Sequence, residues 1–282
     1  MQRRSILQLA VAGALASGVA LPAFAQQGHR PRRLTPGDTV ALVAPASVTY
    51  ESLELQLALE TLEAMGLKVK VGDHVMDRFG YLAGKDEDRA ADINAAFADT
   101  RIDAVFALRG GWGASRILPY LDFDVIRKNP KILLGYSDIT SLLNAVFAKT
   151  GLITFHGPNV MSRWNDFTHQ GMRRVLFEAR AEVYENPVIA DDDLVARDHR
   201  IQTITSGVAE GPLIGGNLTL MSALLGSPYL PSFSGAILFL EDVGEAIYRV
   251  DRMLTQLSLS GELRQVSGII FGHFTGVEPN PG

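Results

Sequence analysis

Hydrophobic and polar positions follow two different patterns along this chain, and the changes between them predict its secondary structure. Continuous apolar runs and short alternating runs, typical of strands, alternate along the chain with segments whose apolar residues recur at helical spacing. The predicted strands cover residues 39–45, 68–71, 104–108, 131–136, 152–155, 236–240 and 266–274. The predicted helices cover residues 53–65, 86–97, 138–149, 218–225 and 248–259. This alternation predicts an α/β fold with a mostly parallel sheet and helices on both of its faces.

The same pattern divides the chain into two predicted α/β domains. The periodicity weakens over residues 161–206, where a polar stretch containing Asp191–Asp193 is typical of a linker or an inserted arm. We therefore predict an N-terminal domain over residues 37–160, a connecting segment over 161–206 and a C-terminal domain over 207–282. Residues 26–36 are polar and contain proline, which is typical of a linker.

The first 25 residues have the pattern of an export signal. A basic start, Met1–Arg4, precedes an apolar run over Ile6–Leu21 that is short and weak for a membrane-spanning helix. Ala23 and Ala25 form a small-x-small cleavage site, so the mature chain is expected to begin at Gln26. The paired arginines leave the twin-arginine and the ordinary secretory routes open, and an uncleaved anchor or a buried helix is the alternative to export. We expect a periplasmic protein without stable membrane insertion after cleavage.

Composition excludes several classes of function. The 282 residues contain no cysteine, which excludes disulfides, thiolate metal sites and a cysteine nucleophile. A formal net charge of −5 argues against a nucleic-acid partner, since such proteins normally carry a basic surface. The histidines are scattered singly, and no cluster of His, Asp and Glu has a convincing metal-ligand spacing.

Three polar segments follow predicted strands, at the edge where parallel α/β sheets bind ligands. They are Arg109–Gly113, Tyr136–Asp138 and Glu241–Asp242. Ser137 falls at a tight strand-to-helix junction, which would expose its hydroxyl beside backbone N–H groups able to stabilise an anion. The alternative is that Ser137 or Asp138 only caps the following helix. The complete Gly-x-Ser-x-Gly pattern of a nucleophile elbow is absent.

The glycines of the first segment suit a loop that approaches a ligand closely. Gly110, Gly111 and Gly113 surround Trp112, and glycine tolerates the dihedral angles that aim backbone N–H groups at a ligand. The segment matches neither a dinucleotide fingerprint nor a phosphate-binding loop. A plain turn is the alternative.

Glu241 follows five apolar residues, so its carboxylate emerges from a buried strand and needs a partner. It could orient a histidine in a catalytic triad, or it could pair with Arg249 or Arg252. His156 and His273 lie at predicted strand ends, where each could be a base or a structural side chain.

Taken together, these segments resemble the LD-carboxypeptidase family of serine peptidases, which includes the microcin-immunity hydrolases. The resemblance begins at residue 37 and keeps the order of the family. The matching stretches are Gly37–Ser47, Ala107–Gly113, Gly135–Thr140, Phe155–Pro158, Gly215–Leu218, Leu240–Glu245 and Tyr248–Leu254.

The resemblance implies a serine, glutamate and histidine triad in that chain order. It places the nucleophile on Ser137, the histidine-orienting carboxylate on Glu241, and the oxyanion donors on the amides of Gly110, Gly111 and Asp138. The implied reaction is hydrolysis of an L,D-peptide bond that releases the terminal D-alanine of murein tetrapeptides. The implied substrate is a small muropeptide, with no metal or organic cofactor.

One element of the family pattern is missing. The catalytic histidine of the family lies downstream of the strand that contains His273, and this sequence stops at Gly282 before any matching segment. We therefore expect an incomplete triad and an incomplete C-terminal domain. Trp112 and Asn217 flank the glycine-rich loops and are weaker substrate-binding candidates.

Two other functions remain open from the sequence. One is a catalytically silent protein that binds wall peptides and has lost its base. The other is a hydrolase that confers immunity to a peptide-like antibiotic. The oligomeric state is also open, with a homodimer among the alternatives.

Overall fold

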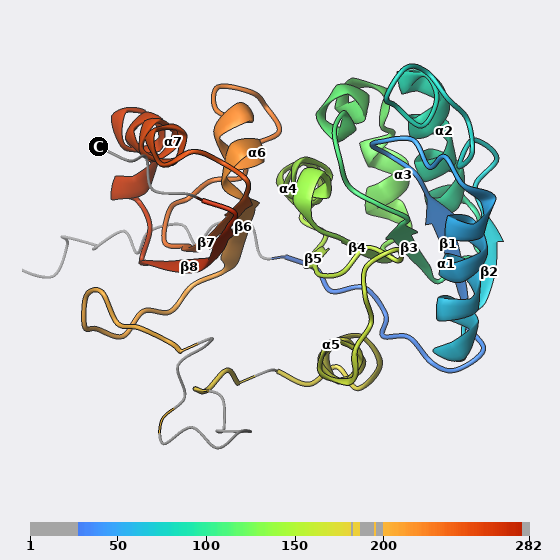
Figure 1. Ribbon diagram of the computed structural model, residues 1–282, viewed down its shortest axis with the longest axis horizontal. Coiled ribbons are helices and arrows are strands. Elements are labelled where there is room, and N and C mark those ends of the chain that lie inside the picture. Colours follow the sequence, from blue (N-terminus) through green and yellow to red (C-terminus); the bar gives the residue numbers. More distant parts are fainter. Residues whose placement is uncertain (1–27, 182, 187–194, 196–199, 278–282) are drawn as a thin grey trace, which may run out of the picture.

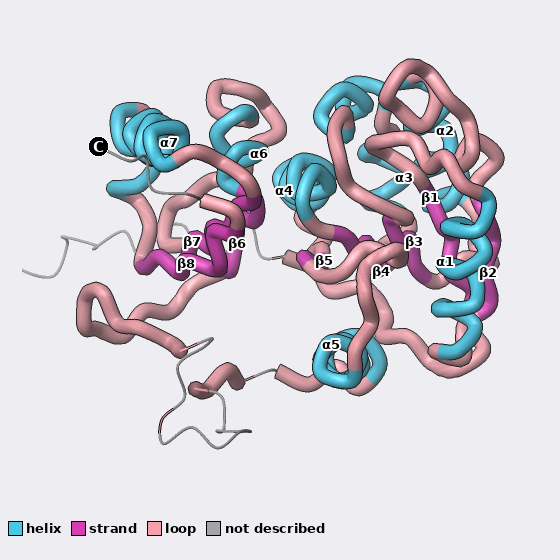
Figure 2. The backbone as a smooth tube through the Cα atoms, viewed as in Figure 1, coloured by secondary structure: helices cyan, strands magenta, loops and turns pink. Residues whose placement is uncertain are grey.

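The computed structural model describes residues 28–181, 183–186, 195 and 200–277. The predicted export signal and the acidic triplet Asp191–Asp193 lie outside the described residues. Two sheets form two units, and Figure 2 shows helix α4 on the side of the first unit that faces strand β6 of the second. No helix in the described part of the chain is long and apolar enough to cross a membrane.

The first sheet has five parallel strands in the order β2-β1-β3-β4-β5 (Figure 1). Its central strands are the apolar runs, and every residue of β3 and β4 is buried because helices cover both faces. The carboxyl ends of the strands lie at one edge, so the loops after β3, β4 and β5 are neighbours. The strands are β1 (Thr39–Val43), β2 (Lys68–Val71), β3 (Ala104–Ala107), β4 (Ile132–Gly135) and β5 (Phe155–His156).

Alternate residues of these strands pack against different helices. Val43 and Val105 belong to a core shared with α2, α3 and α4. Leu42 and Phe106 belong to a second core, shared with α1 and with the segment that follows α5. The helices are α1 (Ser52–Ala64), α2 (Asp86–Ala98), α3 (Phe123–Lys128), α4 (Thr140–Thr150) and α5 (Asp166–Met172), the last continued by a π-helical turn over Arg173–Phe177.

The second sheet has three parallel strands in the order β6-β7-β8. Helices α6 and α7 share one core with it, in which Phe233, Leu238 and Leu257 are fully buried. The elements are β6 (Leu213–Asn217), α6 (Leu218–Ala223), β7 (Ile237–Val243), α7 (Ile247–Leu259) and β8 (Gly268–Thr275). The two sheets confirm the predicted α/β fold with mostly parallel strands.

Several boundaries differ from the prediction. Strand β5 is confined to Phe155–His156, because Leu152 instead bridges His29. The predicted helix over 138–149 begins with a 3₁₀ turn over Ser137–Ile139, which turns the chain sharply after β4.

The structure also contains helices that the periodicity did not predict. Helix α3 is only six residues long, too short for a repeating pattern, and the Asp122 side chain caps it. Helix α5 lies inside the predicted connecting segment, and Met172 and Phe177 pack on the first domain. Leu34, expected in a linker, is 1% exposed in the same core.

Candidate functional site

Ser137 lies directly after β4 in a strained backbone conformation. Its φ of 62° is in the left-handed region, which costs an L-residue about 1–2 kcal/mol. Such strain persists where the surrounding structure imposes it, often at functional sites. Neither Ser137 nor Asp138 provides a side-chain cap for the following helix, so the capping alternative is wrong. The predicted strand-to-helix junction is confirmed.

Asn159 holds the backbone next to this serine. Its Oδ1 accepts the Tyr136 N–H at 3.2 Å, its Nδ2 donates to the Tyr136 carbonyl at 3.4 Å, and its side chain is buried. Sequence analysis did not identify Asn159 as a site residue. The available signal was its place directly after the family stretch Phe155–Pro158.

The glycine-rich loop packs directly against Ser137. A Cβ on Gly110 would lie 3.3 Å from the Ser137 Oγ, so the loop approaches the hydroxyl closely at this glycine. Gly111 has a φ of 111°, and a Cβ there would lie 2.2 Å from the Ser47 Oγ. Within the described residues, the amides of Gly110 and Gly111 have no hydrogen-bond acceptor. The loop therefore contacts the serine through Gly110 and carries two N–H groups that have no acceptor in the described part of the chain.

Ser47, a second residue that sequence analysis did not select, fixes the shape of this loop. Its N–H donates to the Gly110 carbonyl at 3.3 Å, and its Oγ accepts the Trp112 N–H at 3.0 Å. The Trp112 side chain is 68% exposed. The side chain of Trp112, a predicted substrate-binding candidate, is thus exposed to solvent, while its backbone N–H is held by Ser47.

The Asp138 side chain points into the protein. It is 4% exposed, and its Oδ2 accepts the Ala114 N–H at 2.7 Å. Burial raises the pKa of Asp138 to about 6. Its carboxylate is thus engaged within the fold, which leaves its backbone amide as the group that could face a ligand.

Glu241 lies at the end of β7 and faces a histidine of the first domain. Its Oε1 is buried, has no hydrogen-bond partner in the described part of the chain, and lies 3.8 Å from the His156 Nε2. Burial, and then the charge of Asp242, raise the pKa of Glu241 to about 7. Burial lowers the pKa of His156 to about 4, although its side chain keeps 24% of its surface exposed.

The alternative arginine partners of Glu241 make other contacts. Arg249 lies 3.6 Å from Glu245, and Arg252 lies over the Tyr248 ring. An ion pair between Glu241 and either arginine is therefore wrong for this structure.

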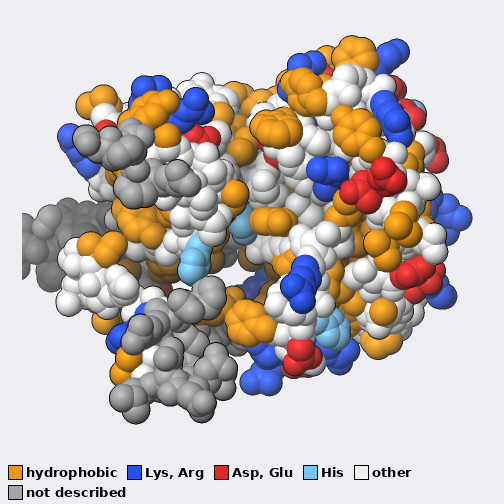
Figure 3. All heavy atoms as spheres, viewed as in Figure 1, with side chains coloured by type: hydrophobic (Ala, Val, Ile, Leu, Met, Phe, Trp, Pro, Cys, Tyr) orange, Lys and Arg blue, Asp and Glu red, His pale blue; other side chains and the backbone are white. Residues whose placement is uncertain are grey.

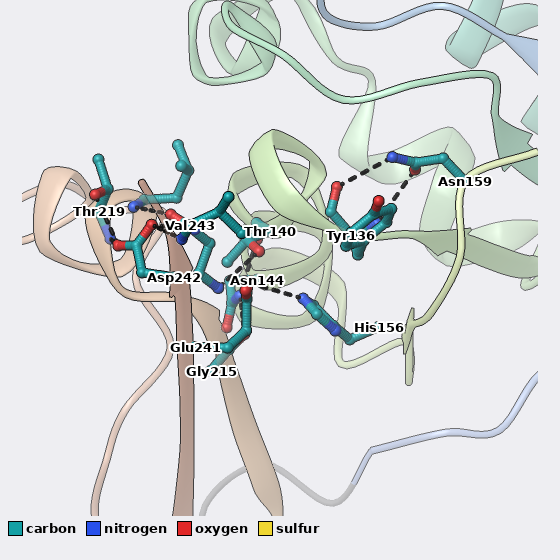
Figure 4. A network of polar contacts seen from close by, with 12 residues as sticks. Tyr136, Thr140, Asn144, His156, Asn159, Gly215, Thr219, Glu241, Asp242 and Val243 are labelled. Atoms are coloured by element: carbon teal, nitrogen blue, oxygen red, sulfur yellow. Dashed lines mark hydrogen bonds and ion pairs between the residues drawn. The ribbon is translucent and has the colours of Figure 1, made fainter. Parts of the chain in front are cut away.

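His156 sits where the two domains meet (Figure 4). Its ring stands edge-on to the rings of Tyr136 and Phe239, with centroids 6.3 Å and 5.5 Å away. A Cβ on Gly216 would lie 2.6 Å from the Thr140 Oγ1 and 3.0 Å from a ring carbon of His156, so only glycine allows this approach.

Two hydrogen bonds fasten helix α4 to β6 at the same boundary. The Asn144 Nδ2 donates to the Gly215 carbonyl at 2.9 Å, and the Thr140 Oγ1 accepts the Asn217 N–H at 3.0 Å. The space-filling view shows a hollow between the two domains with histidine side chains at its margin (Figure 3). The ends of β4 and β7 therefore face one boundary between domains.

The Asn217 side chain is occupied by contacts within its own domain. Its Oδ1 accepts the Leu220 N–H at 3.2 Å and caps α6, while its Nδ2 donates to the buried Asp242 at 2.8 Å. Asn217 pairs with Glu241 in the strand register. It supports the strand end that carries Glu241.

One group of metal-ligand side chains lies outside this region. Ligand atoms of His74, Asp77 and Asp88 all lie within 4.8 Å of one another. The His74 Nδ1 is 2.8 Å from the Asp77 carboxylate, which raises the pKa of the histidine. The contact between His74 and Asp77 explains why two of these three side chains lie so close together.

Comparison with known proteins identifies the family. The LD-carboxypeptidase N-terminal domain matches residues 40–157, and the LD-carboxypeptidase C-terminal domain matches residues 210–281. A probable murein peptide carboxypeptidase of Bacillus subtilis is 40% identical over 255 residues, covering 89% of this chain and 76% of the relative. A murein tetrapeptide carboxypeptidase of Pseudomonas aeruginosa is 39% identical over 249 residues, covering 84% and 76%.

A solved structure has a similar fold across both domains. The structure of MccF in complex with glutamyl sulfamoyl guanosine superimposes with a TM-score of 0.77 at 28% identity, covering 89% of this chain and 83% of that one. Sequence and structure thus match over both sheets and over the serine, glycine-loop and glutamate segments. The chain belongs to the LD-carboxypeptidase family of serine peptidases.

Proposed function

We propose that this protein is a serine carboxypeptidase that hydrolyses the L,D-peptide bond of murein tetrapeptides and releases D-alanine. The observation that carries the proposal is the strained Ser137 with its hydroxyl against the amide-bearing Gly110–Gly111 loop. Relatives at 39–40% identity named as murein carboxypeptidases support the substrate class.

In the proposed reaction, the Ser137 Oγ attacks the scissile carbonyl and passes its proton to a histidine base. The base is a histidine that the family resemblance places downstream of β8, at a position after Gly282 and so outside the printed sequence, and Glu241 would orient it. The amides of Gly110, Gly111 and Asp138 hold the negative oxygen of the tetrahedral intermediate. Protonation of the departing amine releases D-alanine, and water then hydrolyses the acyl-enzyme.

The proposal is tested by incubating the purified protein with a murein tetrapeptide and measuring free D-alanine. An otherwise identical tetrapeptide ending in L-alanine is the matched control. Release from the first peptide alone is the expected result. Tight binding of the tetrapeptide without release would instead favour a silent wall-peptide binder.

The similarity to MccF favours one second candidate, a hydrolase acting on a peptide-like antibiotic. An aminoacyl sulfamoyl nucleoside and the tetrapeptide should then compete for one site. We expect the tetrapeptide to have the higher kcat/KM. The reverse order would favour the immunity function.

We further propose that the protein acts in the periplasm after cleavage between Ala25 and Gln26. The basic start, apolar run and small-x-small site support this location. Peptide sequencing of the protein from the periplasmic fraction of a Gram-negative host should find Gln26 at the N-terminus. Replacing Arg3 and Arg4 by lysine should block export only if the twin-arginine route is used. A cytoplasmic protein that retains Met1 would contradict the proposal.

A further inference from the structure

Arg89 lies fully buried beside the serine site and has no part in the triad. It belongs to α2, is 1% exposed, and reaches the loops that follow β1 and β3. Its Nη1 donates to the carbonyl of Pro45 and, at 3.0 Å, to the carbonyl of Gly113, while its Nη2 pairs with Asp86. A buried cation is costly unless it is paired and hydrogen-bonded, so these contacts give Arg89 a defined position.

We infer that Arg89 is a positioning residue for oxyanion stabilisation: with the Asp138 carboxylate it clamps the Gly113–Ala114 peptide group and so holds the glycine-rich loop against Ser137. This inference rests on the proposed function.

The clamp has a cation at one end of a single peptide group and a carboxylate at the other. Arg89 binds the carbonyl oxygen of Gly113 at 3.0 Å, and Asp138 accepts the following N–H, that of Ala114, at 2.7 Å. The peptide dipole is thus aligned between opposite charges. Because Asp138 directly follows Ser137, this one peptide group ties the end of the glycine-rich loop to the serine turn.

Close packing leaves the glycine-rich loop, Gly110–Gly113, little space to adopt another conformation. Gly113 has a φ of 107°, and a Cβ there would lie 2.3 Å from the Leu82 Cδ2. At its other end the loop touches Ser137 through Gly110. A shift of Gly113–Ala114 would therefore move Gly110 and Gly111, whose amides are the proposed oxyanion donors.

Arg89 is the cation whose charge lowers the pKa of Asp138. Asp86 pairs with both Arg89 and Arg116, and the Arg116 side chain is 51% exposed. Burial raises the pKa of Asp138, whereas the Ala114 N–H and the charge of Arg89 lower it. Removal of the guanidinium should favour the protonated carboxyl group and loosen the clamp.

The test compares binding of a tetrahedral analogue with binding of a ground-state ligand. A peptidyl boronic acid forms a tetrahedral adduct on a serine Oγ and places an oxygen where the oxyanion would lie, and the murein tetrapeptide serves as the ground-state ligand. We expect Arg89→Met to weaken boronate binding about 30- to 100-fold, since misplacement by about 1 Å costs on this order. Tetrapeptide binding to a Ser137→Ala background should change less than about threefold.

Arg116→Met is the matched control, because it removes the other arginine partner of Asp86 and leaves Arg89 in place. It should keep boronate affinity within about threefold of the wild type. The acid limit of boronate binding should move to higher pH in Arg89→Met and should not move in Arg116→Met.

If Arg89→Met does not fold, Arg89→Lys is used, because it keeps the charge but cannot bind the two carbonyls and Asp86 in the geometry of the guanidinium. Selective weakening of the boronate is again expected. Unchanged boronate affinity in a folded variant, or equal loss for both ligands, would overturn the inference. Wild-type protein that binds neither ligand would overturn the proposed function itself and the inference with it.

Discussion

Ser137→Ala is expected to abolish D-alanine release while leaving the fold intact. The hydroxyl supplies the attacking oxygen, so its removal should reduce kcat/KM by about 10³-fold or more. No fold-stabilising cap is lost, because the Ser137 side chain caps no helix in this structure. D-Alanine release by mass spectrometry and thermal unfolding provide the two measurements.

Two further variants test the reason for this loss. Ser52→Ala, at the exposed start of α1, should retain full activity. Ser137→Gly should be equally inactive and at least as stable as Ser137→Ala, because glycine accepts a φ of 62° without strain. Turnover by the alanine variant would show that another group is the nucleophile.

Glu241→Gln is expected to reduce kcat/KM by about 10²- to 10⁴-fold, since the amide cannot stabilise a protonated histidine base as a carboxylate does. The same substitution should change how stability depends on pH. The pKa of Glu241 is raised from 4.5 to about 7, so its contribution to stability is lost as pH rises through that interval. The pKa of His156 is lowered from 6.5 to about 4, so its contribution is lost as pH falls through that interval.

The two contributions oppose each other between about pH 4.5 and 6.5 in the wild type. Glu241→Gln lacks the carboxyl group that holds a proton in the folded state, whereas Asp138 and the other titrating groups remain in both proteins. Relative to the wild type, its free energy of unfolding should therefore rise by about 2 kcal/mol as pH rises from 4.5 to about 7, after allowance for solvent screening. His156→Gln, the matched variant, should show the opposite slope. Denaturant unfolding across this pH range measures both, and parallel profiles for the two variants would refute the assigned shifts.

Local patterns were sufficient for the elements that build the sheets and the serine turn. The apolar runs in β3 and β4 specify strands buried on both faces, because only such strands avoid water along their whole length. The glycines before Trp112 and the polar residues after β4 marked the loops, since parallel strands bring their carboxyl ends to one edge. These features are encoded within a few neighbouring residues.

Short elements and long-range pairs were beyond such patterns. Helix α3 is too short to show a period. Helix α5 is held by the burial of Met172 in the core of the first domain rather than by a strong repeat. The partners of individual polar groups were equally hidden. Arginines close to Glu241 in sequence seemed suitable partners, yet the fold places His156 beside it.

The sequence by itself determined the α/β class, a mostly parallel first sheet and the placement of Ser137 at a sharp turn, because burial periodicity and turn chemistry are local properties. The family was indicated by the resemblance of ordered sequence stretches. Only the tertiary structure decided which charged groups meet. The pairing of Glu241 with His156 depends on two domains meeting at Gly216, and the clamp of Arg89 and Asp138 joins residues 49 positions apart in the chain. Contacts of this kind follow from packing geometry, which no short stretch of sequence contains.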